Sequence, residues 1–166
     1  MKKIILIIMM VFLFSCEAEK EEWKSTGYIY VEEDVVINEI FARSSQDGDP
    51  DWIELYNRGD KDLDIGGYAL LDDKDRNPYF IPEGTIIKKG GFLVIWDARV
   101  DSVDEGFIYG LGAEDEVRLF NADKELIDYV SWDAEELPVD SSKGRFPDGG
   151  DEYRIFETPT PGKPNK

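Results

Sequence analysis

The sequence predicts an all-β fold, a β-sandwich or barrel, for the chain after residue 28. Short runs of β-branched and aromatic residues recur there, and Gly, Pro, Asn and Asp separate them about every 8–12 residues. No stretch of this region keeps the apolar period of a helix. A domain of this size, near 150 residues, buries roughly 70% of the surface that its unfolded chain exposes. Its core therefore needs no disulfide or metal to be stable.

The first strand is expected at Val35–Phe41, which is rich in β-branched residues. Its alternation of apolar and polar residues is imperfect, and Asn38 and Glu39 cannot both be assigned to a face by counting. One extra residue in the strand, a β-bulge, would reconcile the pattern. The polar stretch 44–50 that follows has the composition of a loop.

The second strand is expected at Asp51–Asn57, which alternates cleanly. Its side chains divide between two faces, with Ile53 and Leu55 on one and Trp52, Glu54 and Tyr56 on the other. Because Glu54 is charged, the second face is expected to lie outside the core. Asn57 precedes Arg58 and Gly59 and is expected to bond the backbone of that turn.

The remaining strands follow the same rhythm and are expected at Gly67–Leu71, Tyr79–Ile81, Thr85–Ile87, Phe92–Trp96, Glu116–Phe120 and Glu125–Val130. Phe92–Trp96 is apolar on both faces, which predicts a central, covered strand. Residues 121–124 predict a hairpin turn between the last two strands. Tyr28–Val31 is a candidate for a leading edge strand.

The N-terminus has the features of a targeting segment. Lys2 and Lys3 precede an apolar run, Ile4–Phe14, which is too short to span a bilayer but fits a secretory signal. Leu13–Cys16 resembles the lipobox of bacterial lipoproteins, which implies cleavage before Cys16 and its acylation. An ordinary signal peptide with an incidental cysteine is the alternative. Several acyl chains on one residue would hold the protein firmly on a membrane.

This interpretation divides the chain into a signal peptide at 1–15, a lipidated cysteine with an acidic tether at 16–33, and a folded domain at 34–166. It predicts a protein anchored in the bacterial cell envelope, at the outer membrane, with the periplasmic or surface side left open. Acidic residues directly after Cys16 resemble a surface-export signal of some envelope lipoproteins. A solvated spacer explains them equally well.

The charge of the chain excludes several classes of function. Without Lys2 and Lys3, 17 basic residues face 37 acidic ones, a formal charge of −20. Nucleic-acid binding requires Lys and Arg to displace counterions from phosphates, so no nucleic-acid partner is expected. The chain has no histidine, and Cys16 is its only cysteine. Histidine-based triads, histidine metal sites and disulfides within the domain are therefore impossible.

The order of motifs along the domain resembles the bacterial form of the lamin tail domain. The motifs are Ile37–Ile40, Asp51–Asn57, Gly67–Asp72, Ile81–Thr85, Gly90–Val94, Gly144–Gly149 and Thr160–Gly162, with Asn165 near the end. The resemblance covers about residues 34–165 and implies an immunoglobulin-like β-sandwich. It also implies an interaction module without shared catalytic residues. The coiled-coil rod of nuclear lamins is absent from this sequence, so filament formation is not implied.

Asp47, Asp49 and Asp51 alternate in one loop and form a hypothetical Ca²⁺ site. Clustered carboxylate oxygens on a turn suit this cation. The loop lacks the glycine and glutamate spacing of an EF-hand, and so acidic a chain also produces such runs as plain surface charge. Asp72, Asp73 and Asp75 form a second cluster of the same kind.

Two further candidate sites come from the first two strands. Glu39 and Glu54 could pair as acid and base across neighbouring strands, as in a glycoside hydrolase; the alternative is that they are ordinary strand charges. Trp52, Glu54 and Tyr56 could form an interaction surface whose rings stack on sugars or anchor a protein. The alternative is that a loop or the tether covers them, with Trp23 docking there.

Two expectations concern the end of the chain. Arg145 is expected to pair with an acidic residue and to pin the C-terminal strand. Thr158–Pro164 is rich in proline and is expected to run extended along one edge of the domain.

The function that fits best is a lipid-anchored, non-catalytic envelope protein whose domain binds a protein or polysaccharide. A Ca²⁺-dependent glycan binder and a carboxylate-based hydrolase are the alternatives.

Overall fold

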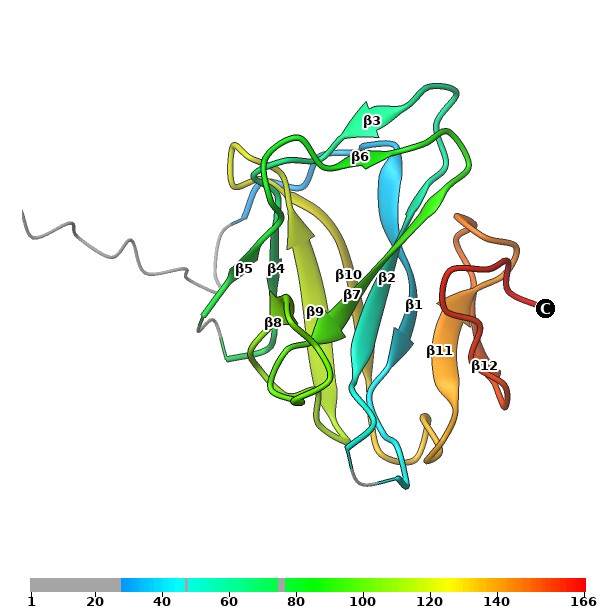
Figure 1. The fold of residues 1–166 in the computed structure, drawn as a ribbon. Helices are drawn as coiled ribbons and strands as arrows, with labels where there is room; N and C mark the ends of the chain where they lie inside the picture. Colours follow the sequence, from blue (N-terminus) through cyan, green and yellow to red (C-terminus); the bar gives the residue numbers. More distant parts are fainter. Residues whose placement is uncertain (1–27, 47, 75–76) are drawn as a thin grey trace, which may run out of the picture.

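The computed structural model describes residues 28–46, 48–74 and 77–166 of the chain, and the regular elements in these ranges are all strands (Figure 1). They are β1 (Val35–Phe41), β2 (Trp52–Asn57), β3 (Leu63–Asp64), β4 (Ala69–Leu71), β5 (Tyr79–Phe80), β6 (Ile86–Ile87), β7 (Phe92–Asp97), β8 (Gly106–Phe107), β9 (Asp115–Phe120), β10 (Leu126–Trp132), β11 (Ser142–Arg145) and β12 (Tyr153–Phe156). Apart from the candidate leading strand at Tyr28–Val31, each predicted strand is found near its expected bounds. The predicted all-β fold is confirmed.

Two sheets face each other as an immunoglobulin-like β-sandwich. One sheet has the strand order β12-β11-β1-β2-β7-β8, and the other has the order β10-β9-β4-β5. A small ribbon of β3 and β6 lies at one end of the sandwich (Figure 1). All neighbouring strands are antiparallel except β7 and β8. The predicted hairpin joins β9 and β10, and Lys124 adopts a positive φ in its turn.

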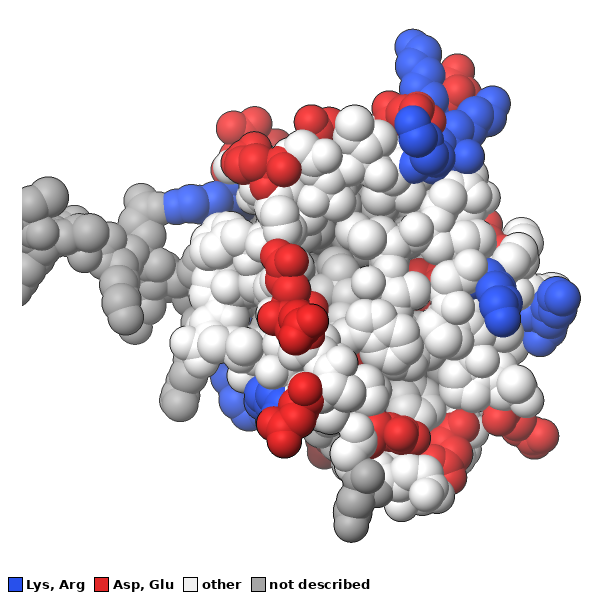
Figure 2. Space-filling view, in the orientation of Figure 1, with Lys and Arg blue, Asp and Glu red and all other residues white. Residues whose placement is uncertain are grey.

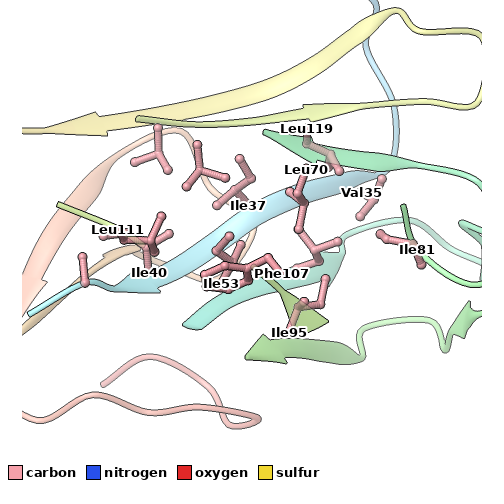
Figure 3. Close-up of a cluster of buried hydrophobic side chains, with 14 of the residues drawn as sticks. Val35, Ile37, Ile40, Ile53, Leu70, Ile81, Ile95, Phe107, Leu111 and Leu119 are labelled. Carbon is pink, nitrogen blue, oxygen red and sulfur yellow. The ribbon is translucent and has the colours of Figure 1, made fainter. Parts of the chain in front are cut away.

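The core fills the space between the two sheets (Figure 3). Ile37, Ile53 and Leu55 enter it from the larger sheet, and Leu70 and Leu119 enter it from the smaller one; none of the five is exposed to solvent. The predicted core assignment of Ile53 and Leu55 is therefore confirmed. Burial of such side chains contributes about 1.5–3 kcal/mol each and is the main force that holds the sheets together.

The predicted bulge is present in β1. The register with β2 shifts between Ile37 and Glu39, so Asn38 is the extra residue. The register pairs Ile37 with Leu55 of β2, and side chains bond to the backbone N–H and C=O of Ile37. Its N–H donates to Asp128 Oδ2 at 2.8 Å, and its carbonyl accepts from Arg145 Nε at 2.9 Å.

Arg145 pairs with an acidic residue, as predicted. Its Nη2 lies 2.9 Å from both carboxylate oxygens of Asp128, and its guanidinium lies 4.6 Å from the ring centre of Tyr153. Arg145 belongs to β11, Asp128 to β10 and Tyr153 to β12. The buried cation therefore ties the C-terminal hairpin to the edge of the opposite sheet.

The expectation that Phe92–Trp96 forms a central strand is wrong. β7 pairs with β2 along its length, but β8 covers its other side only at Trp96 and Asp97. Most of its side chains remain partly exposed. β7 is thus apolar on both faces although it lies near the edge of the sheet. Its side chains are only partly covered, and β8 pairs with only its last two residues.

Residues 28–33, which we expected to belong to the tether, already contact the domain. The ring of Tyr28 lies 4.6 Å from that of Phe120, and Val31 N–H donates to Leu126 O at 2.9 Å. The expected leading strand is reduced to a single parallel bridge between Tyr30 and Leu126. In the described ranges, no helix has the length and apolar character needed to cross a membrane.

Candidate functional site

The candidate site residues Cys16, Trp23, Asp47 and Asp75 lie outside the described ranges. Their predicted roles in lipidation, docking and Ca²⁺ binding stay predictions.

The two described aspartates of the hypothetical Ca²⁺ site take different partners. Asp49 is exposed and accepts a hydrogen bond from Ser44 Oγ at 3.1 Å. Asp51 accepts one from Leu111 N–H at 3.1 Å and lies 3.9 Å from the Arg99 guanidinium. Burial raises the pKa of Asp51 to about 6. Across residues 28–46, 48–74 and 77–166, no three acidic side chains converge as metal ligands would.

The structure does bring Glu39 and Glu54 together. The register of β1 and β2 places them directly opposite each other, and neither is exposed. The bulge at Asn38 is the reason, because it turns Glu39 to the side of the sheet that faces away from the core. Both carboxyl groups therefore lie on the outer side of the larger sheet, yet they are buried there.

The C-terminal segment, residues 158–165, covers this carboxyl pair. The Thr160 N–H donates to Glu39 Oε1 at 3.1 Å, and the Gly162 N–H donates to Glu54 Oε2 at 2.6 Å. Asn165 N–H donates to Asp148 Oδ1 at 3.1 Å. The segment thus crosses the outer face of the sheet, and the expectation that it follows one edge is wrong. The buried carboxylates on this face need hydrogen-bond donors, and the backbone N–H groups of the segment supply them.

Side chains of the sheet complete the hydrogen bonds of the pair. Asn38 Nδ2 donates to Glu54 Oε1 at 2.9 Å and to Asp148 Oδ1 at 3.0 Å. The Ser142 hydroxyl donates to Glu39, as does the Thr160 hydroxyl at 3.0 Å. Every hydrogen-bond donor to the two glutamates is neutral.

Burial raises the pKa of both glutamates because no cation replaces the lost hydration. The pKa of Glu54 rises to about 7, against an ordinary value of 4.5; the hydrogen bonds from Asn38 and Gly162 oppose this rise, and the charge of Glu39 adds to it. The pKa of Glu39 is raised for the same reason, with Ser142 and Thr160 opposing. A carboxyl group that is protonated near neutral pH suits general acid catalysis. Here, however, the covering segment occupies the place of a substrate.

The expected interaction surface at Trp52, Glu54 and Tyr56 is not open. Trp52 is 3% exposed and packs between Phe41 and Trp96, with ring centres 5.9 and 6.1 Å away. Glu54 is buried as described above, and Tyr56 is half-buried. Neighbouring rings on β1 and β7 enclose Trp52, and the C-terminal segment covers Glu54, which the alternation of one strand cannot reveal. The alternative that a loop covers this face holds for Glu54.

The loop 146–150 supplies part of this covering. Gly149 N–H donates to Asn38 Oδ1 at 3.0 Å. A Cβ atom on Gly149 would lie 2.9 Å from the Tyr56 ring, so the backbone rests directly on that ring. The positive φ of 68° at Gly149 allows this approach. Glycine is thus required here for two independent reasons.

An acidic hollow lies at the ends of β9 and β10, with carboxylates from Asp73, Glu114, Asp115, Glu116, Asp133 and Glu136 on its walls. Burial raises the pKa of Asp115, which faces Asp73. Lys143 pairs with Glu136 at 2.6 Å. In the part of the chain that the structure describes, these carboxylates do not form a group that could hold a metal ion.

A smaller, apolar pocket was missed in the sequence. It has a volume of about 230 Å³ and lies between the segment 79–85 and β7. Its lining includes Tyr79, Ile81, Pro82, Leu93, Val94 and Glu105. This volume is below the range of about 300–1,000 Å³ that is typical of small-molecule sites. Figure 2 shows a largely uncharged middle on one face of the domain, with acidic side chains to its left and below it and basic ones at the upper right and the right.

The comparison with known families agrees with the resemblance noted in the sequence. A family model described as the Lamin Tail Domain matches residues 30–134 of the chain. The match begins at the bridge between Tyr30 and Leu126 and ends just after β10. A search of curated proteins finds no match.

Proposed function

The chain belongs to the lamin tail domain family, and from this premise we propose that it is a non-catalytic interaction module held at the bacterial envelope. Its anchor is the lipid expected on Cys16, at the outer membrane. Its partner is a protein. The carboxyl pair Glu39 and Glu54 serves to hold the C-terminal segment rather than to act on a substrate.

This proposal rests on the different exposure of the two candidate surfaces to solvent. The carboxyl pair is completely buried, and hydrogen bonds from the C-terminal segment satisfy it. The pocket beside β7, in contrast, is open and lined mainly by apolar residues, with Glu105 as its one charged lining residue. A contact surface with these properties favours protein binding over hydrolysis.

A polysaccharide partner was the other half of the expectation. Stacking on sugar rings requires exposed aromatic faces, and the Trp52 ring is enclosed by Phe41 and Trp96. This loss of the expected stacking surface favours a protein.

The test combines membrane fractionation with site-specific crosslinking in cells of the source bacterium. A photo-reactive phenylalanine analogue replaces Thr85 in the pocket, and the same analogue at the exposed Asp151 is the matched control. We expect a discrete adduct from position 85 and none from position 151. Cys16→Ser should move the protein out of the membrane fraction and weaken the adduct.

Equal adducts from both positions, or none from position 85, would contradict the proposal. If the Cys16→Ser variant stays in the membrane fraction, the lipid anchor is no longer part of the proposal.

A further inference from the structure

The edge of β7 that faces away from β2 has backbone groups without strand partners. Asn57 N–H donates to Gly91 O at 3.1 Å, and Asp97 N–H donates to Asp51 O at 2.9 Å. Residues that bond to a given neighbour alternate along an antiparallel strand. The odd-numbered residues of β7 therefore bond to β2, and Phe92 and Val94 direct their N–H and C=O groups to the other side. No strand of the described ranges pairs with that side before Trp96.

The same edge already accepts one short strand of the chain itself. β8 pairs with β7 in parallel at Trp96 and Asp97, and Ala98 N–H donates to Phe107 O at 2.8 Å. Gly106 allows this approach, because a Cβ atom there would lie 1.8 Å from Trp96 O. β8 ends the pairing after two residues. The same edge of β7 has no paired strand along Phe92–Ile95, a length of about 13 Å at ~3.3 Å per residue.

The apolar pocket opens beside this free edge. Leu93, Val94 and Ile95 form one wall, and Ile81 and Pro82 form the opposite one. A strand laid along β7 would direct every second side chain towards the pocket. Its small volume suits such a side chain. Recognition by strand addition combines these two elements, backbone bonds for affinity and a pocket for alternate side chains.

The charge of the chain indicates which strand would bind. Glu105 stands at the β8 end of the pocket, and the formal charge of the chain after residue 15 is −20. A second copy of so acidic a chain would bring like charges together, which opposes edge-to-edge pairing of two copies. A basic segment is attracted instead.

We propose that β7 binds an extended segment of a partner protein, with alternating basic and apolar residues, as an added strand along Phe92–Ile95. This inference rests on the proposed function and specifies the partner class at the same pocket. The apolar side chains enter the pocket, and the negative charge of the chain attracts the basic ones.

Amide hydrogen exchange tests the strand pairing directly. The full chain in detergent micelles is followed by NMR while an eight-residue peptide of alternating lysine and valine is added. We expect saturable binding that slows exchange at Phe92 and Val94 by about tenfold or more. Leu93 and Ile95 bond to β2 in either state, so their exchange should not change.

A peptide of the same sequence, N-methylated at every second residue, is the matched control because it keeps the charge and loses the donors of one edge. We expect no protection from it. Equal protection by both peptides, or slow exchange at Phe92 and Val94 in the free protein, would overturn the proposal. A dimer that protects the same amides without peptide would also overturn it.

A pair of variants tests whether the peptide and the partner in cells bind to the same edge of β7. Val94→Pro removes the outward N–H, and proline is tolerated where no ladder bond is lost; Val94→Thr keeps the N–H and the shape. We expect Val94→Pro to lose peptide binding and the position-85 adduct while its melting temperature stays near that of Val94→Thr. An adduct that persists in folded Val94→Pro would overturn strand addition and leave the interaction role intact. If no adduct forms in any variant while the peptide still binds, the proposed function fails and the strand site stands.

Discussion

Glu39 on β1 and Glu54 on β2 face each other across two paired strands, and both are buried beneath the backbone of residues 160–162. Two neighbouring carboxyl groups without a counter-cation cannot both ionise at low cost. Their role in this fold is to accept hydrogen bonds from the C-terminal segment. The raised pKa values result from the burial of the two groups, which these hydrogen bonds offset only in part.

The first prediction concerns the pH dependence of stability. The pKa of Glu54 is about 7 in the folded protein and near 4.5 when unfolded, so the folded state holds its proton more tightly. This contribution to stability is complete below pH 4.5 and is lost as the pH rises through 7. We expect the free energy of unfolding to fall by about 2–3 kcal/mol between pH 5 and 8, measured by urea unfolding.

Glu54→Gln tests the origin of this slope. Glutamine cannot ionise, so the variant should show a clearly smaller loss over the same range, although it loses a hydrogen bond at every pH. Glu152→Gln, at an exposed position, should keep the parent slope. An unchanged slope in Glu54→Gln would assign the effect to other groups, of which Asp51 also has a raised pKa.

The second prediction concerns Arg145 and Asp128. Arg145→Met leaves the Asp128 carboxylate buried without its cation and removes the donor to Ile37 O. We expect a loss of about 3–5 kcal/mol in the free energy of unfolding, measured by urea denaturation. Adding Asp128→Asn removes the uncompensated charge, so the double variant should lose less than the sum of the two single variants. Strict additivity would show that the two residues do not act as a pair.

The third prediction concerns the attachment of the C-terminal segment. The Thr160 hydroxyl lies 3.0 Å from Glu39 Oε2 and 2.8 Å from Asn165 Oδ1. Thr160→Val keeps the shape and removes the hydroxyl, so we expect a loss of about 1–2 kcal/mol and faster proteolysis after residue 157. Thr158→Val changes an exposed position of the same segment and should behave like the parent. Equal effects from both variants would mean that side-chain shape, not the bond to Glu39, decides.

The fourth prediction separates two demands on glycine. Gly149 and Gly48 both have positive φ, but a Cβ atom meets the Tyr56 ring only at Gly149 and meets nothing within 4 Å at Gly48. Gly48→Ala should cost about 1 kcal/mol from the backbone alone. Gly149→Ala should cost roughly 1–3 kcal/mol more because of the contact, as measured by thermal melts. Similar costs at the two sites would show that Tyr56 moves aside freely.

The fifth prediction concerns calcium. The carboxylate of Asp51 accepts from Leu111 N–H and lies near Arg99, so we expect equal melting temperatures in Ca²⁺ and in EDTA. A ligand of the folded state alone must raise the melting temperature by mass action. A rise of several degrees that Asp49→Asn abolishes would establish the loop as a cation site. Mg²⁺ at equal concentration controls for screening of the acidic surface.

The sequence by itself determined the local structure of this protein. Alternation in Asp51–Asn57 placed Ile53 and Leu55 in the core, and the broken pattern of Val35–Phe41 indicated a bulge, which the structure locates at Asn38. Asn57 Oδ1 accepts from Gly59 N–H at 2.9 Å, as the turn composition predicted. These features depend on the period of a strand and on turn chemistry, which act over a few residues.

The tertiary structure alone decided the two surfaces that matter for function. Glu54 is buried because Gly162, 108 residues further along the chain, crosses over it. β7 has a free edge because β8 stops after two residues, although its apolar sequence suits a central strand equally well. Alternation reports which side chains share a face, but not what covers that face or which strand lies next. Those depend on contacts between segments far apart in the sequence, and only the folded chain brings them together.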